Sequence, residues 1–224
     1  MRRMTERFVL MLACAGGLAA GTLDWQGVSW DDTSYPPSSL AVDGAGDLVV
    51  TPPVGDYGAA HYNTPDLFRA ALAPWVQVTF QDPGSGNRGQ LWLEDEGSGG
   101  AWTQFGAWNT YANYQIWWWD YDTNLDGWRD TGIARTAGNH TFKIGMQSSG
   151  AVDYYLDGAP VWSTTDITPA KFGDVYLAAM ADSAVFVDYS AGTDYAPTPE
   201  PASLTLIGLG AVGIAWAGRR RRAR

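Results

Sequence analysis

The sequence contains almost no cysteine or histidine. Among 224 residues there is one cysteine, Cys14, and two histidines, His61 and His140. Cys14 lies in an N-terminal segment that we expect to be removed, so the mature chain would have neither disulfides nor thiol chemistry. Neither histidine has a partner at metal-ligand spacing, and no nucleophile elbow, phosphate-binding loop or dinucleotide fingerprint occurs. A domain of this composition must be held together by its apolar core.

Positive charge is also scarce in the middle of the chain. Residues 21–198 contain 6 Lys and Arg against 22 Asp and Glu, a formal charge of 6 − 22 = −16, whereas the whole chain sums to −10. An acidic body of this kind repels nucleic acid and anionic lipid. It suits neutral glycans, cations or cationic surfaces as partners. The alternative is that the charge only keeps the protein soluble.

The C-terminal segment combines three features in a fixed order. Pro199-Glu200-Pro201 is followed by an apolar run, residues 202–218, and then by Arg219-Arg220-Arg221-Arg222. A helix over the run would be roughly 25 Å long, slightly short of a hydrocarbon core of about 30 Å, and the arginines should stay cytoplasmic. The segment resembles the PEP-CTERM sorting tail of Gram-negative bacteria. The resemblance implies recognition and removal by an exosortase in the inner membrane; a permanent C-terminal anchor is the alternative.

The N-terminus has the features of a signal peptide. Arg2, Arg3 and Arg7 precede an apolar stretch, residues 8–15, and small residues follow as far as Gly21. This order predicts export, with cleavage near residue 19 or 20. Because Met11-Leu12-Ala13-Cys14 loosely resembles a lipobox, a lipoprotein is the alternative.

The residues between the two ends predict an all-β domain. Runs rich in Val, Tyr, Trp, Phe and Thr alternate with Gly, Pro, Asp and Asn clusters, and only residues 65–73 suggest a turn of helix. About a dozen strands with tight turns favour a two-sheet antiparallel sandwich, while the lack of a fixed repeat disfavours a propeller or β-helix. The predicted strands are 39–42, 48–51, 75–81, 89–94, 102–108, 114–121, 128–135, 141–147, 151–156, 160–163, 175–180 and 184–189.

A late segment of the body carries a second pattern. His140-Thr141-Phe142-Lys143-Ile144-Gly145 leads into Val152-Asp153-Tyr154-Tyr155-Leu156-Asp157-Gly158. This strand and hairpin resemble the late strands of concanavalin A-like lectins and glucanases, the laminin-G-like group included. A closing strand at 185–189 and an early hairpin at 40–44 agree with the pattern. The resemblance covers residues 23–195 and implies a jelly-roll sandwich.

Tryptophan is the most unusual component of the body, since the chain contains 12 of them. Because side chains alternate along a strand, Trp117 and Trp119 should share one face and Trp118 the other. Flat aromatic rings suit the CH groups of pyranose sugars, and β-sandwich lectins use a concave sheet for that contact. The alternative is that large aromatic side chains fill a broad core. We predict glycan-binding residues at Trp92, Trp102, Trp108, Trp117 and Trp119.

Two nearby carboxylates, Glu94 and Glu96, are the candidates for catalysis. On one strand face they would lie a little under 7 Å apart, and retaining glycosidases place their carboxyls about 5–5.5 Å apart. Concanavalin A-like glucanases carry Glu-x-Asp-x-x-Glu on such a strand, whereas Glu96 is followed directly by Gly97-Ser98-Gly99-Gly100. We interpret the motif as a strand end that enters a solvated loop. A glycoside hydrolase or lyase is the alternative.

Oxygen ligands recur at alternate positions in Asp122-x-Asn124-x-Asp126-Gly127, and Asp130 stands at the ninth position. This spacing matches the first half of a calcium loop. Position twelve is Ile133 instead of the usual glutamate. Calcium is therefore the only cofactor that the sequence suggests, and a hairpin turn rich in Asn, Asp and Gly is the alternative.

Together these features predict an exported surface or matrix protein that binds polysaccharide without catalysis, with a purely structural matrix protein as a further alternative. Its expected partners are an exosortase and a polysaccharide, not nucleic acid, and it would contact the membrane only through its C-terminal helix before processing. The predicted processing residues are Pro199, Glu200, Pro201, Arg219, Arg220, Arg221 and Arg222. The predicted segments are a signal peptide (1–20), the sandwich (21–195), a linker with Pro-Glu-Pro (196–201), a transmembrane helix (202–218) and an Arg cluster (219–224).

Overall fold

The described part of the chain is all β. The computed structural model describes residues 22–32, 39–53, 57–63, 67, 73–86, 88–94, 100–108, 110–167 and 172–195. The predicted signal peptide, linker, transmembrane helix and Arg cluster lie outside these residues, as do Glu96 and most of the predicted helical turn at 65–73. Among the described residues, no helix is long and apolar enough to cross a membrane.

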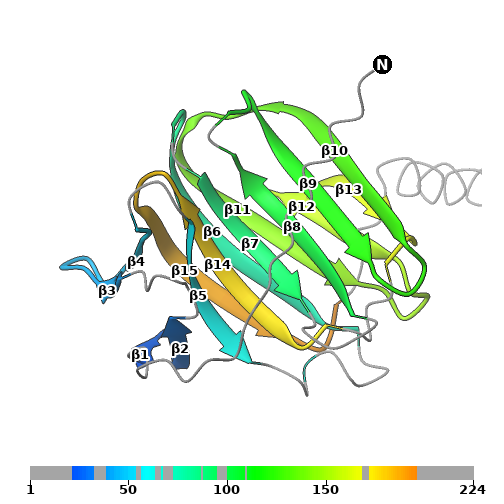
Figure 1. Cartoon of the computed structure of the whole chain (residues 1–224), viewed down its shortest axis with the longest axis horizontal. Helices are drawn as coiled ribbons and strands as arrows, with labels where there is room; N and C mark the ends of the chain where they lie inside the picture. Colours follow the sequence, from blue (N-terminus) through cyan, green and yellow to red (C-terminus); the bar gives the residue numbers. More distant parts are fainter. Residues whose placement is uncertain are drawn as a thin grey trace, which may run out of the picture.

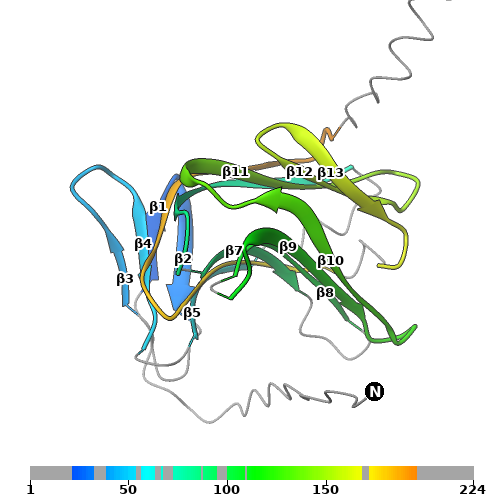
Figure 2. The same ribbon diagram turned by 90° about the horizontal axis from the view of Figure 1, so that it is seen from above.

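Within the described residues, fifteen strands form two antiparallel sheets that lie face to face (Figures 1 and 2). In spatial order, the eight-stranded sheet contains β1 (Thr22–Trp25), β2 (Val28–Asp32), β5 (Tyr57–Asn63), β14 (Asp174–Met180), β7 (Arg88–Glu94), β8 (Ala101–Ala107), β9 (Asn113–Asp120) and β10 (Leu125–Ala134). The seven-stranded sheet contains β13 (Ala159–Thr164), β12 (Val152–Leu156), β11 (Ala137–Met146), β6 (Trp75–Pro83), β15 (Ala184–Gly192), β4 (Leu48–Thr51) and β3 (Ser39–Val42).

The predicted two-sheet sandwich is confirmed, and all twelve predicted strands are present with ends shifted by up to four residues. The Asp157-Gly158 turn between β12 and β13 has positive φ at both residues, 51° and 79°, as its composition predicts. Three strands were missed: β1, β2 and β5. Strand β5 has the sequence YGAAHYN, which contains no β-branched residue. It forms a strand because Ala59 and Ala60, both fully buried, fit between β2 and β14.

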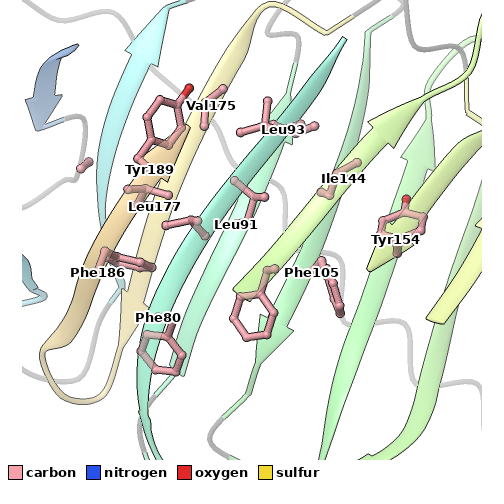
Figure 3. Packing of buried hydrophobic residues seen from close by; sticks show 14 of the residues in the cluster. Phe80, Leu91, Leu93, Phe105, Ile144, Tyr154, Val175, Leu177, Phe186 and Tyr189 are labelled. Carbon is pink, nitrogen blue, oxygen red and sulfur yellow. The ribbon is translucent and has the colours of Figure 1, made fainter. Parts of the chain in front are cut away.

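The core fills the space between the sheets by strict alternation of side chains. In β6, Val76, Val78 and Phe80 are fully buried, whereas the residues between them are half-exposed. From the other sheet, Leu91, Leu93 and Phe105 meet them (Figure 3). Each fully buried aliphatic or aromatic side chain contributes about 1.5–3 kcal/mol relative to an exposed one. With no cysteine among the described residues, this burial is the main source of stability.

One buried ion pair ties the sandwich to the loop before β9. The Arg135 guanidinium donates two hydrogen bonds to the Asp82 carboxylate, from Nε to Oδ2 at 3.0 Å and from Nη2 to Oδ1 at 2.8 Å. Both side chains are almost wholly buried. Nη1 of Arg135 donates to the Trp108 carbonyl at 2.8 Å. A bidentate pair is geometrically rigid. It therefore fixes the position of Trp108, where β8 has just ended.

Candidate functional site

The eight-stranded sheet is curved, and its concave side faces away from the other sheet (Figure 2). Because successive side chains of a strand point to opposite faces of the sheet, the core residues identify which side chains lie on the concave side. Leu91 and Leu93 belong to the core, so Trp92 and Glu94 point outward. Trp118 likewise belongs to the core, so Trp117 and Trp119 point outward, as predicted from the Trp-Trp-Trp run.

Strand register aligns these outward side chains into two rows that cross the sheet. Directly opposite residues in antiparallel strands have Cβ atoms about 4.5–5.5 Å apart, so each row is a line of near neighbours. One row runs from β5 to β10 as His61, Tyr176, Trp92, Gln104, Trp117 and Trp128. The second runs as Asn63, Asp174, Glu94, Trp102, Trp119 and Asp126.

The first aromatic group lies over β5, β14, β7 and β8. The Trp92 ring lies 5.4 Å from that of Tyr176, 5.9 Å from that of Tyr57 and 6.3 Å from that of Trp102, measured between ring centroids. The Tyr176 ring in turn stacks on His61 at 4.7 Å, with 25° between the planes. Ala59 and Ala178 pack beneath this group. Small residues at these positions leave room for the large rings to lie across the sheet.

The second aromatic group lies over β9 and β10. Trp108 stacks on Trp117 at 5.2 Å with 21° between the planes, and Trp117 lies 6.2 Å from Trp128. Tyr111 closes the group, 5.8 Å from Trp128 and 6.4 Å from Trp108. Trp128 is 44 % exposed. Its ring is therefore available to a ligand at the edge of the sheet.

All five tryptophans that we predicted as glycan-binding thus lie on one face. We call this surface the aromatic face and define it by Tyr57, Trp92, Trp102, Trp108, Tyr111, Trp117, Trp119, Tyr121, Trp128 and Tyr176. Sequence reasoning missed its tyrosines and Trp128. Trp128 could have been found, since it begins a predicted strand, whereas Tyr57 lies on a strand that the sequence did not predict.

Among the described residues, several indole N–H groups of the aromatic face have no hydrogen-bond partner. Nε1 of Trp92, Trp117 and Trp119 is shielded from solvent and has no hydrogen-bond partner among the described residues. A buried donor without a partner costs free energy of about 1–3 kcal/mol. Because these N–H groups are shielded, the ring faces and not the N–H donors are the groups that this surface offers to a ligand.

A polar cluster lies at one end of the aromatic face. Asp174 Oδ1 lies 2.8 Å from His61 Nε2 and accepts a hydrogen bond from Asn63 Nδ2 at 2.9 Å. Glu94 is directly opposite Asp174 in the register of β7 and β14. Burial raises the pKa of the nearby Tyr121 phenol, and the negative charge of Glu94 raises it further. The carboxylate opposite Glu94 thus comes from another strand, as Asp174 of β14. Glu96, the predicted partner of Glu94, lies outside the described residues.

Two of the predicted calcium ligands lie far apart. Asp120 Oδ1 accepts hydrogen bonds from the backbone N–H groups of Asp122 and Thr123, which closes the turn. Asp126 and Asp130 lie four residues apart along β10, a separation of about 13 Å at strand geometry, too far to share one ion. Among the described residues, no group of three or more His, Cys, Asp or Glu side chains could hold a metal ion. Calcium binding at this turn stays a prediction.

Solved structures place this fold among concanavalin A-like lectins and glucanases. The carbohydrate recognition domain of Emp46p matches with a TM-score of 0.53 and 10% identity, over 75% of this chain and 89% of that one. The transglycosylase Crh5 matches with a TM-score of 0.54 and 15% identity, over 81% of this chain and 88% of that one. The β-glucanase of Bacillus licheniformis matches with a TM-score of 0.52 and 10% identity, over 81% of this chain and 91% of that one. A potassium-bound form of the Emp46p domain is also similar, with a TM-score of 0.52 and 11% identity. The predicted jelly-roll sandwich is confirmed.

The sorting tail is also identified by comparison. Residues 197–222 match the PEP-CTERM protein-sorting motif. The chain therefore carries the signal of an exported protein that is anchored transiently at the membrane and processed by exosortase. No curated protein matches the chain.

Proposed function

We propose that the body is a non-catalytic polysaccharide-binding domain, delivered by its sorting tail to the cell surface or extracellular matrix. The observation that carries this proposal is the aromatic face. Ten aromatic side chains lie over six adjacent strands, from β5 to β10, a width of about 24 Å at the usual strand spacing. A globular protein has no structural need for such a layer on the outside of a sheet.

The charges around this face favour a neutral glycan. Glu94, Asp174 and Asp126 lie in the row beside the tryptophans. Asp130 follows further along β10, and hydrogen bonds from the Gly132 backbone N–H and from Asn113 lower its pKa, so it is anionic at neutral pH. Uronate or sulfate groups would be repelled by these carboxylates. Contact between the ring faces and the CH groups of a sugar requires no charge on the sugar.

A glycan array on residues 21–198 tests this proposal. We expect binding to neutral glucans or related neutral polymers and none to uronate-rich ones. A folded sample that binds no glycan on the array would contradict it and would favour the purely structural alternative. The indole fluorescence of the aromatic face gives a second readout, since a bound sugar changes the environment of the rings.

The pairing of Glu94 with Asp174 favours hydrolysis as the second candidate function. Directly opposite residues have Cβ atoms about 4.5–5.5 Å apart, which would allow their carboxyl groups to reach the separation of about 5–5.5 Å that retaining glycosidases use. Release of reducing sugar from neutral β-glucans, abolished in Glu94→Gln and in Asp174→Asn, would establish an enzyme. Binding without such release would leave the non-catalytic proposal standing.

A further inference from the structure

The described chain ends on the side of the sandwich opposite the aromatic face. The orange end of the ribbon lies on the outer side of the seven-stranded sheet (Figure 2). There Tyr195 packs on Gly145 of β11, so closely that an added Cβ at Gly145 would lie 2.3 Å from the ring. Phe142 and Ile144 of the same strand belong to the core, so Gly145 is on the outer surface of that sheet.

The side chain of Tyr195 is firmly held there. Its hydroxyl donates to Asp153 Oδ2 at 2.7 Å and lies 2.7 Å from the Tyr155 hydroxyl. Only 7 % of the residue is exposed. Its backbone N–H donates to the carbonyl of Ala73 at 2.8 Å.

The neighbouring residue adds further contacts. Asp194 accepts a hydrogen bond from Trp75 Nε1 at 2.9 Å, and Lys143 Nζ lies 4.6 Å from the Trp75 ring centroid and 5.3 Å from that of Tyr195. We call Trp75, Lys143, Asp153, Tyr155, Asp194 and Tyr195 the C-terminal clasp. It fixes the chain to the sheet up to Tyr195.

Only a short stretch separates the clasp from the apolar run that starts at Ala202. From Tyr195 to Ala202 the chain can span at most about 25 Å, even when fully extended. The two sheets of a sandwich lie about 10 Å apart and each bears side chains outside, so the aromatic face is about 20 Å farther from the tail than the clasp is. The clasp therefore must stay near any membrane that holds the tail.

We propose that, while the tail is in the membrane, the seven-stranded sheet is the side turned to the bilayer and the aromatic face is turned away from it. The short tether and the clasp together favour this orientation. Adhesion does not contribute, because an acidic body is repelled by anionic lipid. The anchored precursor thus presents its aromatic face outward, toward the matrix, before the tail is removed. This orientation does not require the aromatic face to bind glycan.

The orientation is tested by measuring how far dyes attached to two faces of the body lie from the lipid headgroups of a vesicle. The exported form, residues 21–224, contains no cysteine, so single cysteines can be introduced at Asp188 on the outer side of β15 and at Asp126 on the aromatic face. Both positions are exposed and both changes remove one negative charge. After reconstitution in phosphatidylcholine vesicles, we measure energy transfer from a dye on each cysteine to acceptor-labelled lipid headgroups.

We expect the Asp188→Cys probe to lie nearer the headgroups, by about 20 Å at the sheet separation given above. Insertion of a long Gly-Ser linker between Thr198 and Pro199 should remove most of this difference. Equal depths for the two probes without the insertion, or a nearer Asp126→Cys probe, would overturn the proposal. A difference that survives the insertion unchanged would overturn it too, because adhesion and not the tether would then orient the body. Glycan binding by residues 21–198 is measured separately, so failure of one proposal is distinguishable from failure of the other.

Discussion

The Trp108 indole stacks on that of Trp117 with ring centroids 5.2 Å apart and 21° between the planes. Trp117 belongs to β9, whereas Trp108 follows the end of β8 and depends on the loop for its position. Arg135 supplies that position through its hydrogen bond to the Trp108 carbonyl. The aromatic face is therefore coupled to a buried ion pair inside the sandwich.

Loss of that ion pair should be costly. Arg135→Ala leaves the Asp82 carboxylate buried without its partner, which typically costs about 3–5 kcal/mol of unfolding free energy. Urea unfolding measures the change. The matched control is Arg129→Ala, since Arg129 is exposed on β10 and its removal should change stability by less than about 0.5 kcal/mol. Equal effects of the two substitutions would contradict the role given to Asp82 and Arg135.

Glycine at position 127 should be required for packing. An added Cβ there would lie 1.8 Å from the Trp118 ring, so Gly127→Ala must displace a core indole. Overpacking of this kind costs about 1–3 kcal/mol. Gly44→Ala is the control, because nothing lies within 4 Å of its Cβ and its φ is not positive. The melting temperatures of the two variants are compared. A Gly127→Ala protein as stable as the Gly44→Ala protein would contradict the close packing of the Trp118 ring on Gly127.

Stability should fall at alkaline pH because several phenols are buried. Burial raises the pKa of Tyr154, Tyr189 and Tyr195, and the hydrogen bond with Tyr155 raises that of Tyr195 further. In the unfolded chain tyrosines ionise near pH 10. Their stabilising effect is therefore complete below about pH 10 and is lost as the pH rises above it.

The melting temperature between pH 8 and pH 12 measures this effect. We expect Tyr195→Phe to be less stable than the wild type at pH 8, since it loses the hydrogen bonds to Asp153 and Tyr155, and to lose less stability on going to pH 12. If the melting temperature fell by the same amount in both proteins between pH 8 and pH 12, Tyr195 would not be one of the phenols that cause the alkaline loss of stability.

The sequence predicted the fold class and the position of most strands because alternation and turn chemistry are local. Trp117, Trp118 and Trp119 could be divided between two faces for the same reason. What could not be predicted was register. Whether Glu94 faces Asp174 or another residue depends on pairing between β7 and β14, which are separated by about 80 residues. Strand β5 was missed because alanine and glycine favour a strand only where neighbours leave no room for larger side chains.

Sugar binding by the aromatic face can be tested most directly through Trp128. Its ring is 44 % exposed, so Trp128→Ala should leave the fold intact. Val42→Ala on β3 is the matched control, since Val42 is 41 % exposed on the edge strand of the other sheet. The measurement is the dissociation constant, by titration calorimetry, for the neutral glycan that binds best on the array.

We expect Trp128→Ala to weaken binding by about tenfold or more, as loss of an interface tryptophan commonly does, and Val42→Ala to leave it unchanged. Unchanged affinity in Trp128→Ala, with wild-type melting temperature, would contradict the assignment of the aromatic face as the polysaccharide-binding site.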